Sequence, residues 1–222
     1  MKSHIHKIAL NILHILDNSF HLELYKKAVR VKDKWYESNN INFIRRFVHP
    51  KIAKIKFMIF PNTAERLRLH LGCGNRRIEG SLNIDWRKTN ATDMVCDIKK
   101  LPFQNNSIEK IESYHVIEHL SRHDVLKALK EWNRVLQSGG TLNIECPDFD
   151  ELVRLYLKGD EKALDGIFAL QRFEGDYHLF GYNYKRLKRV LENSGFTDIK
   201  SRTAQDYHTS EWPCIRVESS KI

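Results

Sequence analysis

The chain has 222 residues, of which 41% are hydrophobic, and its formal net charge is +9 at pH 7. This length and composition suit one α/β domain with a sizeable core and an appendage. No apolar run approaches the ~20 residues that a membrane-spanning helix needs, and the first residues do not resemble a signal peptide. The scattered cysteines Cys73, Cys96, Cys146 and Cys214 argue against a zinc site and a secreted disulfide framework. We expect a cytoplasmic protein.

The basic charge is concentrated near the start of the chain, because residues 1–66 carry +8 and residues 67–222 carry only +1. Apolar residues from Ile5 to Phe20 recur at three- and four-residue steps and predict an amphipathic helix. A second helical stretch is expected at 23–35. We interpret residues 1–65 as a basic helical extension. Three roles stay open for it: packing over the cofactor or between two copies in a homodimer, peripheral docking on an anionic membrane surface, or RNA binding.

From residue 66 onward, short apolar runs alternate with helical patterns. Strands are predicted at 66–71, 81–85, 93–96, 108–114, 141–146, 198–202 and 214–218, and helices at 122–135, 149–157 and 185–194. Such alternation predicts an α/β domain over 66–222, with a doubly wound, Rossmann-like, seven-stranded sheet. No helix separates the last two strands, so they should pair as an antiparallel hairpin. The segment Ser138-Gly139-Gly140 is expected to form a turn before the fifth strand.

A glycine turn follows the first of these strands directly. Leu71 leads into Gly72-Cys73-Gly74, and Asp85 ends the next strand. Glycine tolerates positive φ and lets the backbone approach a ligand closely. A carboxylate at the end of the second strand can accept hydrogen bonds from two ribose hydroxyls. This arrangement is typical of a nucleotide-type ligand.

Five segments in order resemble the class I S-adenosylmethionine (SAM)-dependent methyltransferases. They are LHLGCG at 69–74, NID at 83–85, CDI with LPF at 96–103, SIEKI with HVIEHL at 107–120, and EWNRVL with SGGTL at 131–142. The resemblance implies SAM as cofactor and S-adenosylhomocysteine (SAH) as product. It also implies that Asp85 binds the ribose and that Asp97 and Ile98 frame the adenine. The cofactor site would comprise Leu71, Gly72, Cys73, Gly74, Asn75, Asp85, Trp86, Asp97, Ile98, Tyr114 and His115.

The link between Gly74 and Asp85 is short. Its 10 residues are too few for a crossover helix with its loops, so we expect that helix to be reduced to about a turn. This shortened form resembles a subset of small methyltransferases that is often associated with polysaccharide and lipopolysaccharide assembly. By that analogy the resemblance favours a sugar hydroxyl as the acceptor.

A hydroxyl acceptor needs a base, and four residues are candidates: His115, Glu118, His119 and His178. If a helix begins at His115, then His115, Glu118 and His119 share one face. A base, an acceptor contact and a structural role all stay open for them. Some relatives hold a divalent metal here with acid and histidine, but the first position in this chain is His rather than Glu. We therefore expect no metal.

The motifs favour an enzyme that methylates a hydroxyl of a small molecule or glycan. One alternative is an RNA methyltransferase that uses the basic N-terminal segment as a clamp, although nucleic acid is the less favoured partner. A second alternative is a non-catalytic binding module that kept the fold. Cys146 ends the fifth strand, where some RNA cytosine methyltransferases place a nucleophile, but we interpret it as a core residue.

Overall fold

The computed structural model of the chain describes residues 67–222, which lie within one unit, Pro50–Ile222. The expected amphipathic helices and the helical extension at 1–65 lie outside the described residues. The roles considered for that extension stay predictions.

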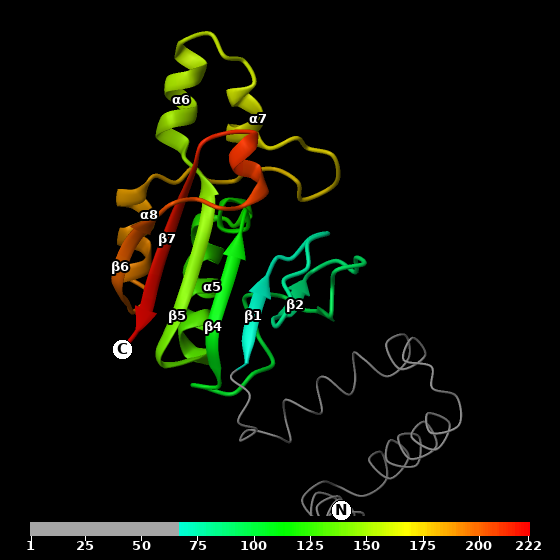
Figure 1. The fold of residues 1–222 in the computed structure, drawn as a ribbon, viewed down its shortest axis with the longest axis vertical. Coiled ribbons are helices and arrows are strands. Elements are labelled where there is room, and N and C mark those ends of the chain that lie inside the picture. Colours follow the sequence, from blue (N-terminus) through cyan, green and yellow to red (C-terminus); the bar gives the residue numbers. More distant parts are fainter. Residues whose placement is uncertain (1–66) are drawn as a thin grey trace, which may run out of the picture. The chain divides into compact units, whose positions relative to one another are not determined.

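Seven strands form one sheet in the order β3-β2-β1-β4-β5-β7-β6 (Figure 1). They are β1 (Arg68–Leu71), β2 (Leu82–Asp85), β3 (Met94–Val95), β4 (Ile108–Tyr114), β5 (Leu136–Pro147), β6 (Phe196–Arg202) and β7 (Cys214–Lys221). Neighbouring strands from β3 to β5 are parallel, and β7 is antiparallel to both β5 and β6. The Rossmann-like α/β sheet and the antiparallel pairing of its last two strands are confirmed. A short 3-10 helix, η2 (Tyr207–Ser210), lies in the connection between those strands.

Four α-helices accompany the sheet in the described part of the chain. They are α5 (Arg122–Val135), α6 (Phe149–Leu157), α7 (Ala163–Phe168) and α8 (Tyr184–Glu192). The predicted bounds of α5 and α6 are confirmed, whereas α8 ends two residues earlier than expected. The six-residue α7 is too short to produce a helical periodicity, so the sequence did not reveal it. None of the helices described here is both long and apolar enough to cross a membrane.

The expected turn at Ser138-Gly139-Gly140 is wrong in detail, because these residues belong to β5. The register jumps from Ile108↔Leu136 to Lys110↔Thr141, so the extra residues form a bulge opposite β4. Gly139 supplies a φ of 73° at this bulge. A bulge absorbs extra residues while the strand continues on both sides, which explains how a glycine-rich segment remains in a strand.

The two faces of the sheet differ in chemistry. The helices α5 and α8 lie behind the sheet in Figure 1, and their buried residues Trp132 and Leu187 join Leu71 and Leu142 of the sheet in one hydrophobic core. The opposite face carries polar rows: His70 lies beside Glu112, and Glu112 beside Asn143. Within residues 67–222 no α-helix links β1 to β2 or β2 to β3, as expected for the first link from its length. The second helical layer of a doubly wound sheet is therefore not seen in this part.

Candidate active site

The glycine turn after β1 is tied to the acid at the end of β2. Gly72 and Gly74 adopt φ values of 70° and 50°, and the Gly74 N–H donates to Asp85 Oδ2 over 2.8 Å. A Cβ on Gly74 would meet nothing within 4 Å, so open space adjoins the turn. Leu71 and Cys73 are buried beneath it, and Asn75 is exposed beside it. The turn thus presents backbone rather than side chains to a ligand.

Asp85 is buried, and each of its carboxylate oxygens already has one backbone partner. Oδ1 accepts from the Arg87 N–H over 2.8 Å and Oδ2 from Gly74. Each oxygen keeps a further lone pair that a ribose hydroxyl can use. The next residue, Trp86, is 59% exposed, and the Arg87 guanidinium lies over both its ring and that of Phe173. A cationic and aromatic surface therefore adjoins the Asp85 carboxylate.

The segment expected to frame the adenine is anchored at Ile98 and open at Asp97. The Ile98 carbonyl accepts a 3.0 Å hydrogen bond from the Trp132 indole of α5. The Asp97 side chain is 59% exposed, and its Oδ1 accepts from the Lys99 N–H over 2.9 Å. Asp97 therefore closes a local turn, and its second oxygen, Oδ2, lies 3.9 Å from Lys99 Nζ.

Tyr114, at the end of β4, is held in the polar face of the sheet. Its hydroxyl donates to Glu112 Oε1 over 2.9 Å and accepts from Arg216 over 3.3 Å. Burial, reinforced by the Glu112 charge, raises the pKa of Tyr114 to about 12. Tyr114 is therefore a neutral hydrogen-bonding residue at ordinary pH and not a base.

No helix begins at His115, so the condition under which His115, Glu118 and His119 would share one helical face is not met. His115 has a φ of 53° and stands outside the 3-10 helix η1 (Ile117–His119). This left-handed residue turns the chain sharply after β4 and brings the His115 ring back toward Glu118, with Nδ1 at 3.2 Å from Oε1. The contact arises from the turn rather than from the spacing of a helical face.

The histidine of the later loop, His178, reaches the same place through backbone contacts. The N–H groups of Leu179 and Phe180 donate to the Glu118 carbonyl over 2.8 and 3.2 Å. His178 Nε2 then lies 3.9 Å from Glu118 Oε1, and the His119 and His178 rings meet edge to face at 4.8 Å. We refer to Glu118, His119 and His178 as the acid–imidazole cluster. The four base candidates therefore come together.

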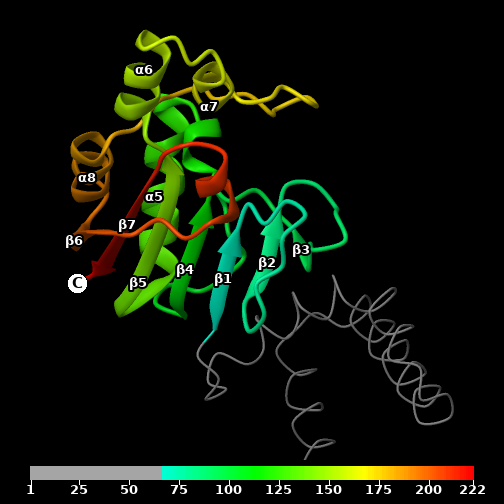
Figure 2. The same ribbon diagram turned by 45° about the horizontal axis from the view of Figure 1, so that its top comes forward.

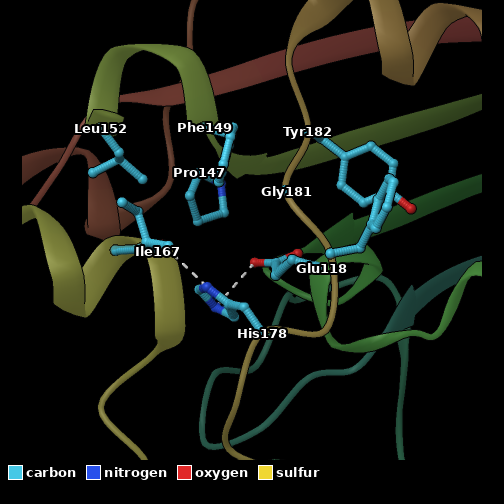
Figure 3. A pocket seen from close by; sticks show the side chains of 10 residues that line it. Glu118, Pro147, Phe149, Leu152, Ile167, His178, Gly181 and Tyr182 are labelled. Atoms are coloured by element: carbon cyan, nitrogen blue, oxygen red, sulfur yellow. Dashed lines mark hydrogen bonds and ion pairs between the residues drawn. The ribbon is translucent and has the colours of Figure 1, made fainter. Parts of the chain in front are cut away.

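A small cavity of about 10 Å³ borders this cluster, which is room for about one water-sized particle. Glu118 and His178 point toward each other at its edge, and Pro147, Phe149 and Ile167 supply apolar walls (Figure 3). Cys146 of the neighbouring strand is fully buried, and burial raises the pKa of its thiol well above the usual range. The interpretation of Cys146 as a core residue agrees with this environment, because a nucleophilic cysteine needs an accessible thiolate.

The sequence missed a group from the β6–β7 connection that closes over the same edge. The His208 ring lies 4.1 Å from His115, and Cys214 Sγ lies 3.7 Å from His115 Nε2. Asp206 forms an ion pair with Arg76 beside the glycine turn and accepts from His208 Nδ1 over 2.7 Å. The only available signal was a histidine in the loop before the last strand, which by itself indicates nothing about its partners.

Residues 76–144 match a protein family described as "Methyltransferase domain". A demethylmenaquinone methyltransferase of Staphylococcus haemolyticus (strain JCSC1435) is 32% identical over 117 residues, covering 48% of each chain. Its counterpart in Staphylococcus aureus (strain JH9) is 30% identical over 139 residues, covering 56% of this chain and 57% of that protein. The chain thus spans about half the length of the curated relatives it matches.

Solved structures show the same fold. A SAM-dependent methyltransferase from Methanosarcina mazei superimposes with a TM-score of 0.52 at 16% identity, covering 74% of this chain and 97% of that one. Together with the family match over residues 76–144, this likeness supports the recognition made from the ordered motifs.

Proposed function

We propose that the chain is a SAM-dependent methyltransferase that transfers a methyl group to a hydroxyl of a small molecule or glycan. The match of residues 76–144 to a methyltransferase family and the shared fold support this proposal. SAM, when bound, supplies a methyl group on a positively charged sulfur, and SAH is the product. The acceptor oxygen forms the new bond to the methyl carbon as the carbon–sulfur bond breaks, and the hydroxyl proton passes to a base. The protein must orient the acceptor and exclude water.

The observation that carries this proposal is the meeting of two groups at one edge of the sheet. The glycine turn with Asp85 stands at the carboxyl ends of β1 and β2, and the imidazoles follow the end of β4. In open α/β sheets, ligands bind outside the carboxyl ends of the strands. A cofactor on the glycine turn would therefore direct its methyl group toward the side where the imidazoles lie.

We assign the base role to His115. Its Nδ1 lies 3.2 Å from a buried carboxylate oxygen of Glu118, which would stabilise the imidazolium after Nε2 takes a proton. His115→Gln should lower kcat by about 100-fold or more. Because the resemblance also places His115 in the cofactor site, SAH titration of the same variant separates the loss of a base from a loss of cofactor binding. The exposed His123 offers a matched control, because His123→Gln should leave kcat unchanged. Full activity of His115→Gln would remove this residue from the proton transfer.

The cofactor site is tested by calorimetric titration of the full chain with SAH. Asp85→Ala and the isosteric Asp85→Asn should both weaken binding, because the asparagine keeps the size but loses one acceptor oxygen. Glu192→Ala, which removes an exposed carboxylate at the end of α8, should bind like the wild type. If the well-folded wild type binds no SAH, the enzyme proposal fails and a binding module becomes the better interpretation.

A hydrophobic acceptor is a second candidate, favoured by two observations. The curated relatives are named demethylmenaquinone methyltransferases. In addition, Phe173, Tyr177 and Leu179, in the same loop as His178, are each at least 40% exposed. Methyl transfer from labelled SAM to a panel of sugars, phenols and demethylmenaquinone would separate the candidates. Turnover of demethylmenaquinone alone would replace the glycan proposal.

A further inference from the structure

The acid–imidazole cluster has the features of a metal site. The sequence led us to expect no metal here; from the structure we propose instead that Glu118, His119 and His178 bind one divalent first-row transition-metal ion, of the Zn²⁺, Co²⁺ or Mn²⁺ kind. Ion binding itself does not depend on methyl transfer. Only the role of the ion beside the acceptor rests on the proposed function.

The first argument is the carboxylate of Glu118. Its side chain is 3% exposed. His115 Nδ1 lies 3.2 Å from Oε1, but within residues 67–222 neither carboxylate oxygen has a hydrogen-bond donor in good geometry, and Oε2 has no ion-pair partner either. The fold satisfies a comparable group fully at Glu145, which accepts from the Gln205 and Asp206 N–H groups and pairs with Arg216. An ionised carboxylate without such donors is costly to bury. A cation would supply the missing partner.

The second argument is the tautomer of the two histidines. His119 Nδ1 lies 2.9 Å from the Tyr177 carbonyl, and His178 Nδ1 lies 3.1 Å from the Gly166 carbonyl. A carbonyl only accepts, so Nδ1 carries the proton and the neutral ring has a lone pair at Nε2. Histidines that bind metals are commonly held in this way, with the second nitrogen donating to a carbonyl.

The third argument is that these lone pairs converge on the carboxylate. His178 Nε2 faces Glu118 Oε1 at 3.9 Å. A neutral Nε2 and a carboxylate oxygen both present electron pairs and repel each other. A bound cation turns this repulsion into attraction.

The distances and donor types suit a transition metal better than Mg²⁺. One ligand atom from each of the three residues lies within 4.8 Å of the others, and ligands at ordinary bond lengths are separated by about 3.3 Å. Side-chain movements of about 1 Å would close the site. Two imidazoles with one carboxylate favour Zn²⁺, Co²⁺ or Mn²⁺, whereas Mg²⁺ prefers oxygen ligands. Three protein ligands leave a position for water or an acceptor oxygen.

Two other groups could hold an ion by distance alone, and both include His115. In one of them Asp206 is already paired with Arg76 and His208. In the other, Glu145 is satisfied by two backbone N–H groups and Arg216. Asp206 Oδ2 also lacks a hydrogen-bond donor in good geometry, but it pairs with the permanently charged Arg76. Among the described residues, the acid–imidazole cluster is thus the candidate group in which both carboxylate oxygens lack such a donor.

The test is titration of the chelator-treated full chain with Co²⁺, followed by visible absorption, with Zn²⁺ as competitor. We expect one Co²⁺ with a ligand-field spectrum that Zn²⁺ displaces. Glu118→Gln and His178→Gln should each lower the affinity by about 100-fold or more. His123→Gln and His208→Gln should bind like the wild type. Each variant is compared with the wild type, and all of them keep the histidines near the N-terminus. Co²⁺ ions bound at those histidines therefore do not change the difference in affinity.

A wild-type chain that binds no Co²⁺, or that binds it equally in Glu118→Gln and His178→Gln, overturns the proposal. Titration of each preparation with SAH separates the two ideas. Metal binding without SAH binding would keep the metal site and refute the methyl transfer. SAH binding without metal binding would refute the metal site and leave the methyl-transfer proposal standing. Thermal unfolding adds a further readout, since Zn²⁺ should raise the melting temperature of the wild type and not that of Glu118→Gln.

Discussion

At the scale of single residues, Gly72 shows how tightly the site is built. Its φ of 70° already disfavours any other residue, and a Cβ at this position would lie 2.2 Å from Val116 Cγ2. Val116 follows His115 directly, so the glycine turn of β1 and the turn after β4 touch at this point. Gly80 has a similar φ of 77°, but a Cβ there would meet nothing within 4 Å. Comparing alanine substitutions at Gly72 and Gly80 therefore separates the cost of a positive φ from the cost of a steric clash.

We expect Gly80→Ala to lower the free energy of unfolding by about 1–2 kcal/mol, the cost of left-handed backbone for an alanine. Gly72→Ala should cost about 1–3 kcal/mol more because of overpacking against Val116, and it should also weaken SAH binding. Urea unfolding and SAH titration of both variants measure these effects. Equal destabilisation by the two substitutions would contradict the close contact with Val116.

At the scale of elements, α5 supports the cofactor side as well as the core. Its Trp132 holds the Ile98 carbonyl, and its Arg134 donates to the carbonyls of Leu101 and Phe103. Glu131 accepts from the Leu101 N–H over 2.7 Å. One helix thus anchors the connection between β3 and β4, where the adenine-side residues lie. Loosening α5 should therefore affect both stability and the cofactor segment.

The start of α5 is capped by Ser121, whose Oγ accepts from the Asp124 N–H over 3.1 Å. Ser121→Ala should lower the free energy of unfolding by about 1 kcal/mol, because that N–H loses its partner. Ser121→Asp supplies another good cap and should stay close to the wild type. Urea unfolding of the three proteins checks this, and an unchanged midpoint for Ser121→Ala would show that the cap contributes nothing.

At the scale of the whole molecule, buried histidines couple stability to pH. His70, on the polar face of the sheet, is 2% exposed and contacts Asn83 Oδ1 at 2.9 Å through Nδ1. Burial lowers the pKa of His70 from its ordinary 6.5, and the nearby Arg76 charge acts in the same direction, against Asn83 and Glu112. Burial also lowers the pKa of His208. The unfolded chain therefore binds protons at these rings more readily than the folded one.

It follows that the free energy of unfolding should be highest above about pH 6.5 and should decrease as the pH falls toward 5. Each such histidine contributes a slope of at most about 1.4 kcal/mol per pH unit. The carboxylates Glu112 and Asp93, whose pKa values are lowered, would act at lower pH. His70→Gln should reduce the dependence of the free energy of unfolding on pH between pH 6.5 and 5, as measured by urea unfolding. The same pH dependence in the variant and the wild type would rule out this role for His70.

Local sequence patterns predicted most of the fold. The strands, the bounds of α5 and α6, and the short link between Gly74 and Asp85 follow from runs of apolar residues and breakers, which act over a few neighbours. The bulge in β5 and the left-handed turn at His115 did not follow from them. Both depend on how a strand is paired and continued, and a glycine cluster or a histidine has the same local signature in a turn, a bulge or a helix.

The sequence by itself determined the order of the strands along the chain, the glycine turn, the acid that follows it and the imidazoles after β4. Only the tertiary structure decided that His178 and His208 join that edge, and that Glu118 is buried beside three imidazoles without good donors. The reason is physical: backbone hydrogen bonds from Leu179 and Phe180 to Glu118 join segments about 60 residues apart. No periodicity records such contacts, because they form only after the sheet has brought its carboxyl edge together.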